Sequence, residues 1–126
     1  MTEQDVPVAP APPAAFVRLE VLRKRADFLR AARAKRSGQP GFLLQARKRD
    51  DADAPRVGYT CSKKIGNAVT RNRAKRRLRE AARAVLGTQA RDGWDYVLIG
   101  RPTETVSRPF HLLLDDLSRA VAKVHA

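Results

Sequence analysis

The cations between Arg56 and Arg83 are the residues of this chain with the clearest chemistry. In this interval one carboxylate, Glu80, stands against ten lysines and arginines: Arg56, Lys63, Lys64, Arg71, Arg73, Lys75, Arg76, Arg77, Arg79 and Arg83. Like charges at this density repel one another in the free protein, so a partner with regularly spaced phosphates explains them best. Because residues 71–79 follow a helical pattern, the sequence predicts a helix that binds a polyanion.

The whole chain shares this excess of positive charge. It has 26 Lys and Arg against 13 Asp and Glu, a formal net charge of +13 and a pI near 11.2. Nucleic acid is therefore the expected partner. A basic amphipathic helix can also lie on an anionic membrane, but that needs bulky apolar residues opposite the charges, and here the opposite stripe is mostly alanine. Apolar runs such as residues 96–99 are far shorter than the roughly 20 residues of a membrane span.

The histidines and the cysteine do not form a catalytic set. His111 lies beside the apolar face of an expected helix and His125 in an expected fraying terminus, so both are interpreted as structural or solvated. Cys61 falls in an expected strand, where a buried inert thiol is favoured over a nucleophile. The nearby Lys63 and Lys64 would act in the opposite direction by lowering the pKa of the thiol.

Signals for a metal or a bound cofactor are also missing from the sequence. Asp50, Asp51 and Asp53 cluster with no histidine near them, which favours a solvated loop over a metal site. No glycine-rich phosphate-binding loop is present. We therefore expect no catalytic residue, no metal and no cofactor on this chain.

The length of 126 residues and the hydrophobic content of 43% predict one domain with a modest core. Four prolines among alanines in residues 6–15 favour an extended tail, so residues 1–16 are expected to be disordered and residues 17–126 to form the domain. The acidic N-terminus lacks the features of a secretory signal, and the single cysteine suits a reducing compartment. A soluble, cytoplasmic protein is expected.

Local patterns place these residues on elements. A helix is expected from Asp27 to Arg36, ended by Gly38 and Pro40. Residues 41–47 and 56–62 are expected to be strands of a hairpin joined by the loop 48–55, with Val57, Tyr59 and Cys61 on one face of the second strand.

The basic helix is expected to start after a turn at residues 63–67, with Asn67 as its N-cap and Gly87 as its stop. Its narrow apolar stripe consists of Ala74, Leu78, Ala81, Ala82 and Val85. Asn72, Lys75, Arg76, Arg79 and Arg83 project from one flank of that stripe, and Arg73 and Arg77 from the other.

Residues 95–100 are apolar on both sides of the pleat, which predicts a buried central strand. Pro109 is expected as the first residue of a final helix, whose core-facing residues repeat at helical spacing from Phe110 to Val124. The fold class is therefore α+β, a single-domain α-β-β-α-β-α sandwich with a mixed sheet of at least three strands.

Residues 62–69, followed by Arg71-Asn72-Arg73, Lys75-Arg76 and Leu78-Arg79-Glu80, form an ordered series that resembles the bacterial ribonuclease P protein subunit. The match runs from Arg56 to Glu80 and depends on the Ser-Lys-Lys turn, the Gly-Asn-Ala-Val entry and the Arg-Asn-Arg helix occurring together. Weaker similarity at residues 25–28 and 95–99 extends it to roughly residues 18–125.

The resemblance implies a left-handed β-α-β crossover, an exception to the usual right-handed rule. It also implies an accessory role. In this family the RNA subunit holds the catalytic magnesium ions and removes the 5′ leader of precursor tRNA, while the protein assists. The expected partners are therefore the catalytic RNA and precursor tRNA, and magnesium is expected on the RNA.

The resemblance also assigns the site residues. Those expected to face the catalytic RNA are Lys63, Lys64, Arg71, Asn72, Arg73, Lys75, Arg76 and Arg79. Phe28 and Tyr59 are the candidates for the leader cleft between the first helix and the sheet, because an aromatic face stacks on any base; core packing competes on equal terms. Some relatives have further aromatic residues where this chain has Ala32 and Gln45. Contacts with the charged RNA backbone are therefore expected to contribute more to leader binding here than stacking does.

Two other classes remain open on composition alone. A small basic ribosomal protein would have the same charge and tail, and a DNA-binding domain would place the basic helix in a major groove. The ordered motif from Ser62 to Glu80 favours the ribonuclease P interpretation over the ribosomal one. DNA binding would predict a preference for duplexes in a competition assay. Leader base preference, holoenzyme stoichiometry and the state of the tail on RNA are not determined by the sequence.

Overall fold

A five-stranded mixed sheet organises the protein. The computed structural model describes residues 17–126, so the tail expected at residues 1–16 lies outside the described residues. The strands are β1 (Glu20–Val21), β2 (Lys35–Gly38), β3 (Phe42–Lys48), β4 (Arg56–Thr60) and β5 (Trp94–Gly100). The helices are α2 (Arg25–Ala32), α3 (Ala68–Gln89), α4 (Glu104–Ser107) and α5 (Phe110–Val124), with a 3-10 turn, η1 (Lys63–Ile65), before α3. The predicted α+β class is confirmed.

The strand order β1-β4-β5-β3-β2 contradicts the expected hairpin. β3 and β4 are consecutive in the chain but do not pair with each other. Instead, β3 pairs antiparallel with β5 along its whole length, from Phe42 opposite Gly100 to Lys48 opposite Trp94, and β4 lies parallel to the other side of β5. Because β5 is apolar on both faces, it takes the centre of the sheet, and its neighbours are separated from each other by it.

The expected first helix is too long. α2 ends at Ala32, and the residues predicted for its last turn form β2, which pairs antiparallel with β3 from Lys35 opposite Ala46 to Gly38 opposite Leu43. Lys35 and Arg36 therefore lie on β2, an edge strand of the sheet, where their charge discourages pairing with another chain. The two-residue β1, parallel to the start of β4, was also not expected.

The crossover from β4 to β5 runs through α3. The predicted cap is confirmed, since Asn67 Oδ1 accepts a hydrogen bond from the Thr70 backbone N–H at 2.9 Å. The predicted stop is wrong: the helix continues past Gly87 to Gln89, and Gly87 is buried inside it. The five residues predicted as the apolar stripe are all buried. The left-handed sense of the crossover stays a prediction from the resemblance.

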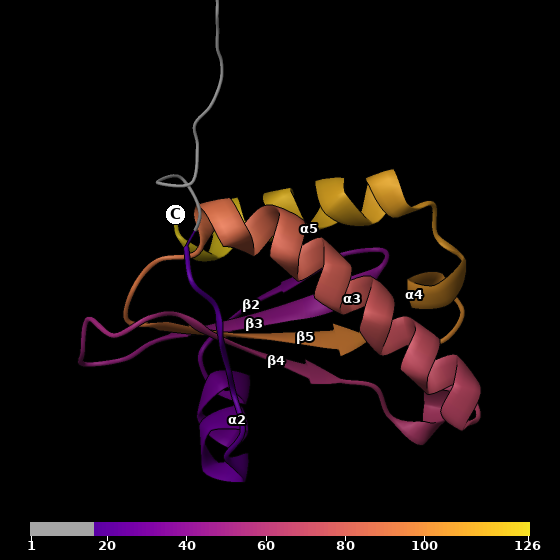
Figure 1. Cartoon of the computed structure of the whole chain (residues 1–126), viewed down its shortest axis with the longest axis horizontal. Coiled ribbons are helices and arrows are strands. Elements are labelled where there is room, and N and C mark those ends of the chain that lie inside the picture. Colours follow the sequence, from indigo (N-terminus) through magenta and orange to yellow (C-terminus); the bar gives the residue numbers. More distant parts are fainter. Residues whose placement is uncertain (1–16) are drawn as a thin grey trace, which may run out of the picture.

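The helices divide between the two faces of the sheet (Figure 1). α3 and α5 cover one face, where the larger core includes Leu78, Leu98 and Leu117. α2 lies alone on the opposite face, over a small second core of Leu22, Ala31 and Val97. No helix among residues 17–126 is long and apolar enough to cross a membrane.

A buried ion network ties α2 and the long loop to the sheet. The carboxylate of Asp95, wholly buried on β5, accepts hydrogen bonds from Arg49 at 2.6 Å and Arg56 at 2.8 Å. Arg56 also pairs with Asp27 of α2 at 3.3 Å. Arg49, itself buried, is held further by Asp51 at 2.8 Å, so the acidic loop is partly structural rather than simply solvated.

The C-terminus does not fray where the sequence predicted it. The His125 ring packs edge-on against Trp94, with centroids 4.3 Å apart, and its Nε2 lies 2.7 Å from the Tyr96 hydroxyl. Burial, followed by the charges of Arg91 and Lys35, lowers the pKa of His125 to about 4. This histidine is therefore a neutral packing residue that fixes the chain end to β5.

Candidate nucleic-acid interface

The outward flank of α3 carries the main basic surface. Its apolar stripe faces the sheet and α5, so the arginines and lysines beside the stripe face water. Arg73, Arg76 and Arg79 are exposed, as are Asn72 and both lysines of η1, while Arg71 and Lys75 are half-buried. None of these cations forms an ion pair with another residue of 17–126. Their charges are thus available to a polyanion.

The turn before α3 extends this surface. η1 places Lys63 and Lys64 at the entry of the helix, while the buried Ile65 anchors the turn to the protein. Gly66 follows with φ +147°, a backbone conformation that favours glycine, and leads directly into the Asn67 cap. The lysines and the helix therefore form one continuous surface, here called the α3 surface: Lys63, Lys64, Arg71, Asn72, Arg73, Lys75, Arg76 and Arg79.

Arg77 does not belong to the α3 surface. Its guanidinium donates a hydrogen bond to the backbone carbonyl of Arg108 and lies over the Phe110 ring, 5.9 Å from the centroid. The side chain thereby joins α3 to the start of α5. Arg73, which the helical pattern places on the same flank, is exposed, so tertiary contacts separate two arginines that look alike in the sequence.

Phe28 projects from α2 onto the second core. It is half-buried against this core, against which Ile99 also packs. Close approach depends on Gly58 of β4, where a Cβ atom would lie 2.5 Å from Phe28 Cζ. The ring therefore packs against the second core and keeps part of its surface free, and its role in leader binding stays a prediction.

Tyr59 lies on the other face of the sheet. Side chains alternate along a strand, so the residue after Gly58 points away from α2. There the Tyr59 ring packs against the main core, and the Arg79 guanidinium lies 5.6 Å from its centroid. Burial raises the pKa of Tyr59, with Arg79 and Arg83 acting in the opposite direction. The hydroxyl therefore keeps its proton near neutral pH and remains a hydrogen-bond donor.

A shallow groove at the edge of the sheet brings the two candidate aromatics together. β1 pairs only with Arg56 and Val57 of β4, so the rest of that strand has no neighbour on this side among the described residues. The resulting groove, here called the edge groove, has a volume of about 460 Å³. It is lined by Arg23, Arg25, Phe28, Tyr59, Thr60, Cys61 and Lys75. A single-stranded nucleic acid that crosses this edge of the sheet would meet cations from both α2 and α3.

The groups considered for catalysis lie apart. Burial raises the pKa of the Cys61 thiol, and the charge of Lys75 opposes this only in part, so the thiol is not an activated nucleophile. His111 is exposed on α5. Among residues 17–126 no three His, Cys, Asp or Glu side chains gather as they would around a metal ion.

Sequence reasoning did not assign Arg23, Arg25 and Arg83 to the site. Arg23 and Arg25 line the edge groove, and Arg83 lies one turn beyond Arg79 on the same side of α3. The helical spacing of Arg79 and Arg83 was the available signal. For Arg23 and Arg25 the short run of basic residues before α2 was the only one.

Comparison with known proteins agrees with this architecture. The family model described as Ribonuclease P matches residues 16–125. The chain is 67% identical over 110 residues to the ribonuclease P protein component of Ruegeria pomeroyi, covering 86% of this chain and 88% of that protein. It is 53% identical over 114 residues to the one of Paramagnetospirillum magneticum, covering 86% and 85%.

Solved structures show the same fold. The Staphylococcus aureus RNase P protein superimposes with a TM-score of 0.68 at 27% identity, covering 83% of this chain and 96% of that one. The Thermotoga maritima RNase P protein gives 0.66 at 30% identity, covering 79% and 93%. Fold, basic helix and sequence therefore agree, and the chain belongs to the ribonuclease P protein family, the accessory protein components of that endoribonuclease.

Proposed function

We propose that this chain docks on the catalytic RNA of ribonuclease P through the α3 surface and helps that RNA to remove the 5′ leader of precursor tRNA. The observation that carries the proposal is the α3 surface itself. Its seven arginines and lysines are exposed or half-buried, and none forms an ion pair with a carboxylate of residues 17–126. Such a surface gains free energy by releasing counterions from an RNA backbone.

The leader is proposed to run through the edge groove. Arg23 and Arg25 would contact its phosphates, and the free part of Phe28 would stack on a base without selecting its identity. Tyr59 reaches the same groove from the opposite face of the sheet. The leader and the catalytic RNA would thus meet neighbouring surfaces, with Lys75 common to both.

Chemistry is assigned to the RNA. We propose that magnesium ions held by the RNA subunit would supply the chemistry of cleavage, while this chain supplies positive charge and position. The raised pKa of Cys61 and the exposed position of His111 support this division of labour. The complex is proposed to act in the cytoplasm, which suits a chain with one unpaired cysteine.

A reconstitution experiment tests the proposal. Purified full-length chain alone should not cleave precursor tRNA, whereas the chain together with the catalytic RNA should cleave it at low magnesium, where the RNA alone is slow. His111→Ala should leave the cleavage rate unchanged, and Cys61→Ala, at a position that lines the edge groove, should leave the rate at saturating precursor tRNA unchanged. Substantial cleavage without RNA, or a large loss of rate in either variant while it remains folded, would overturn the proposal.

A further inference from the structure

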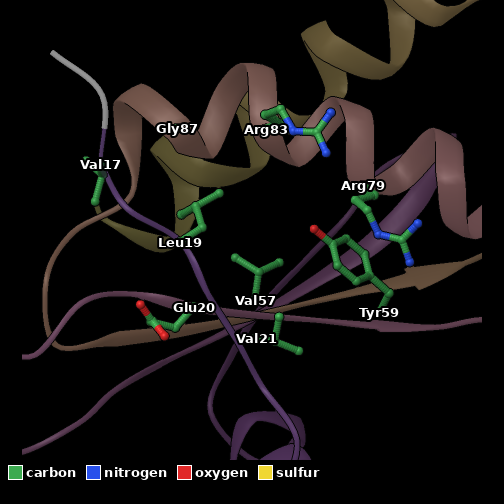
Figure 2. A pocket seen from close by; sticks show the side chains of 9 residues that line it. All are labelled: Val17, Leu19, Glu20, Val21, Val57, Tyr59, Arg79, Arg83 and Gly87. Atoms are coloured by element: carbon green, nitrogen blue, oxygen red, sulfur yellow. The ribbon is translucent and has the colours of Figure 1, made fainter. Parts of the chain in front are cut away.

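A second hollow lies on the α3 side of the sheet, away from Phe28. Figure 2 shows it between the segment from Val17 to Val21, the strand β4 and the helix α3. Its volume is about 370 Å³, within the roughly 300–1,000 Å³ typical of pockets that hold small molecules. We call it the α3 groove. It shares only Tyr59 with the edge groove.

The two ends of the α3 groove differ in chemistry. Leu19, Val21 and Val57 line one end, and Val21 is 57% exposed although it is apolar. Tyr59, Arg79 and Arg83 gather at the other end (Figure 2). An apolar slot that opens onto two guanidinium groups suits a ligand with a flat apolar body and an attached anion. A nucleotide, with its base and its phosphate, has this form.

The electrostatics of the groove favour an anion at the basic end. Neither Arg79 nor Arg83 forms an ion pair with another residue of 17–126. The carboxylate that lines the groove, Glu20, lies toward the apolar end in Figure 2 and is paired with Arg18 at 2.8 Å. The protonated hydroxyl of Tyr59 adds a donor beside the two cations.

Continuity with the α3 surface indicates which RNA fills the groove. Arg83 follows Arg79 by one helical turn, and Arg79 follows Lys75 and Arg76 by one turn, so a backbone docked on the α3 surface leads directly to the groove. Phe28 lies on the opposite face of the sheet.

We propose that the α3 groove captures one unpaired nucleotide of the catalytic RNA. Its base lies against Leu19, Val21 and Val57, and its phosphate contacts Arg79 and Arg83. This inference rests on the proposed docking of α3 on that RNA.

Two substitutions test the groove without disturbing the core. Arg83→Ala should weaken binding of the full chain to the catalytic RNA by about tenfold, the loss of one charge-assisted contact. Val21→Glu adds a negative charge to an exposed position inside the groove and should weaken binding by a similar factor. Arg91→Ala and Ala122→Glu are the matched controls, because both residues are exposed and line neither groove.

Chemical probing of the RNA identifies the captured nucleotide. The assembled complex is treated with dimethyl sulfate and with a reagent that acylates 2′-hydroxyl groups. The wild-type chain should protect one unpaired nucleotide that becomes reactive again with Arg83→Ala and with Val21→Glu. Protections at the rest of the docking site should persist in both variants. Photocrosslinking of the complex with bound precursor tRNA, through Val21→benzoylphenylalanine at a position that lines the α3 groove and not the edge groove, should join position 21 to the catalytic RNA.

The outcomes separate the two proposals. If wild-type chain does not bind the catalytic RNA, both the proposed function and the groove inference fail. If wild-type chain binds and the groove variants bind equally well with unchanged protections, only the groove inference fails. A crosslink from position 21 to the tRNA leader would also overturn the inference, since it would assign the α3 groove to the leader.

Discussion

At the scale of single residues, the arginines of α3 divide into two kinds that composition does not distinguish. Arg73 and Arg76 extend into water, whereas Arg77 is held by the Arg108 carbonyl and the Phe110 ring. A positive charge on this helix is therefore either a binding group or a structural one, according to whether the protein already supplies its partner.

This division predicts opposite effects for neighbouring substitutions. Arg73→Ala and Arg76→Ala should weaken assembly with the catalytic RNA and change the free energy of unfolding by less than about 0.5 kcal/mol, as is usual for surface positions. Each should lower the slope of log K against log salt by at most about 0.9, the duplex DNA value. Arg77→Ala should instead lower the stability and leave the slope nearly unchanged. Salt titrations and urea unfolding measure both; normal binding with early unfolding of Arg73→Ala would place that residue in the structural group.

A substitution can separate the stacking role of the Phe28 ring from its role in core packing. Phe28→Leu keeps an apolar side chain against the second core, so the expected loss of stability is below about 1.5 kcal/mol. If a leader base stacks on the ring, the holoenzyme should lose roughly 1–3 kcal/mol of affinity for precursor tRNA and none for mature tRNA, which has no leader. Phe110→Leu, at a half-buried Phe of α5, is the matched control. Equal weakening for both substrates would exclude Phe28 from leader binding.

At the scale of elements, the position of α2 depends on the missing side chain at Gly58 of β4. Gly58 leaves the space that the Phe28 ring fills, and the pair of Arg56 with Asp27 fixes the same helix to the same strand. The width of the edge groove therefore depends on how closely α2 approaches the sheet.

Gly58→Ala should move α2. The added Cβ would lie 2.5 Å from Phe28 Cζ and 3.2 Å from Leu22 Cβ, so the Phe28 ring must shift. We expect a loss of about 1–3 kcal/mol of stability from overpacking and weaker binding of precursor tRNA, with assembly on the catalytic RNA retained. Adding Phe28→Leu should recover much of the stability, because the shorter side chain clears the new methyl group. Additive losses in this double-mutant cycle would contradict direct contact as the cause.

At the scale of the whole molecule, the chain closes on itself where His125 meets β5. The His125 ring packs edge-on against both Trp94 and Tyr96, so the last residues hold α5 onto the start of the central strand β5. His125 lines neither groove, which allows the closure to be tested independently of RNA binding.

The closure predicts a pH dependence of stability. His125 has its pKa lowered from 6.5 to about 4 in the folded chain, so between these values the unfolded chain binds a proton that the native chain does not. Stability should therefore fall as the pH falls from about 6.5 toward 4. His125→Gln removes the titrating group and should flatten this part of the curve, while the same substitution at the exposed His111 is the control. Parallel curves for wild type and His125→Gln in thermal unfolding would contradict the buried, neutral histidine.

Several features of the fold and the site followed from short stretches of sequence. The Asn67 cap, the apolar stripe of α3 and the buried strand β5 depend on local hydrogen bonding and on a period that neighbouring residues define. The basic character of α3 also belongs to this group, because charge is counted from composition. The ordered motif from Ser62 to Glu80 identified the family for the same reason.

Other features required contacts between distant parts of the chain. Lys35 and Arg36 fit a helical pattern in the sequence, but they form a strand because they pair with β3. The segments β3 and β4 look like a hairpin in the sequence, but each pairs with the apolar strand β5 instead of with the other. Tyr59 and Phe28 lie on opposite faces of the sheet because side chains alternate along β4: Phe28 packs over Gly58, and the next residue, Tyr59, points the other way. Local propensity determined the helix α3, and composition determined its charge. The pairing of the strands and the face of the sheet on which each groove lies were decided by burial in three dimensions, which no short window of sequence records.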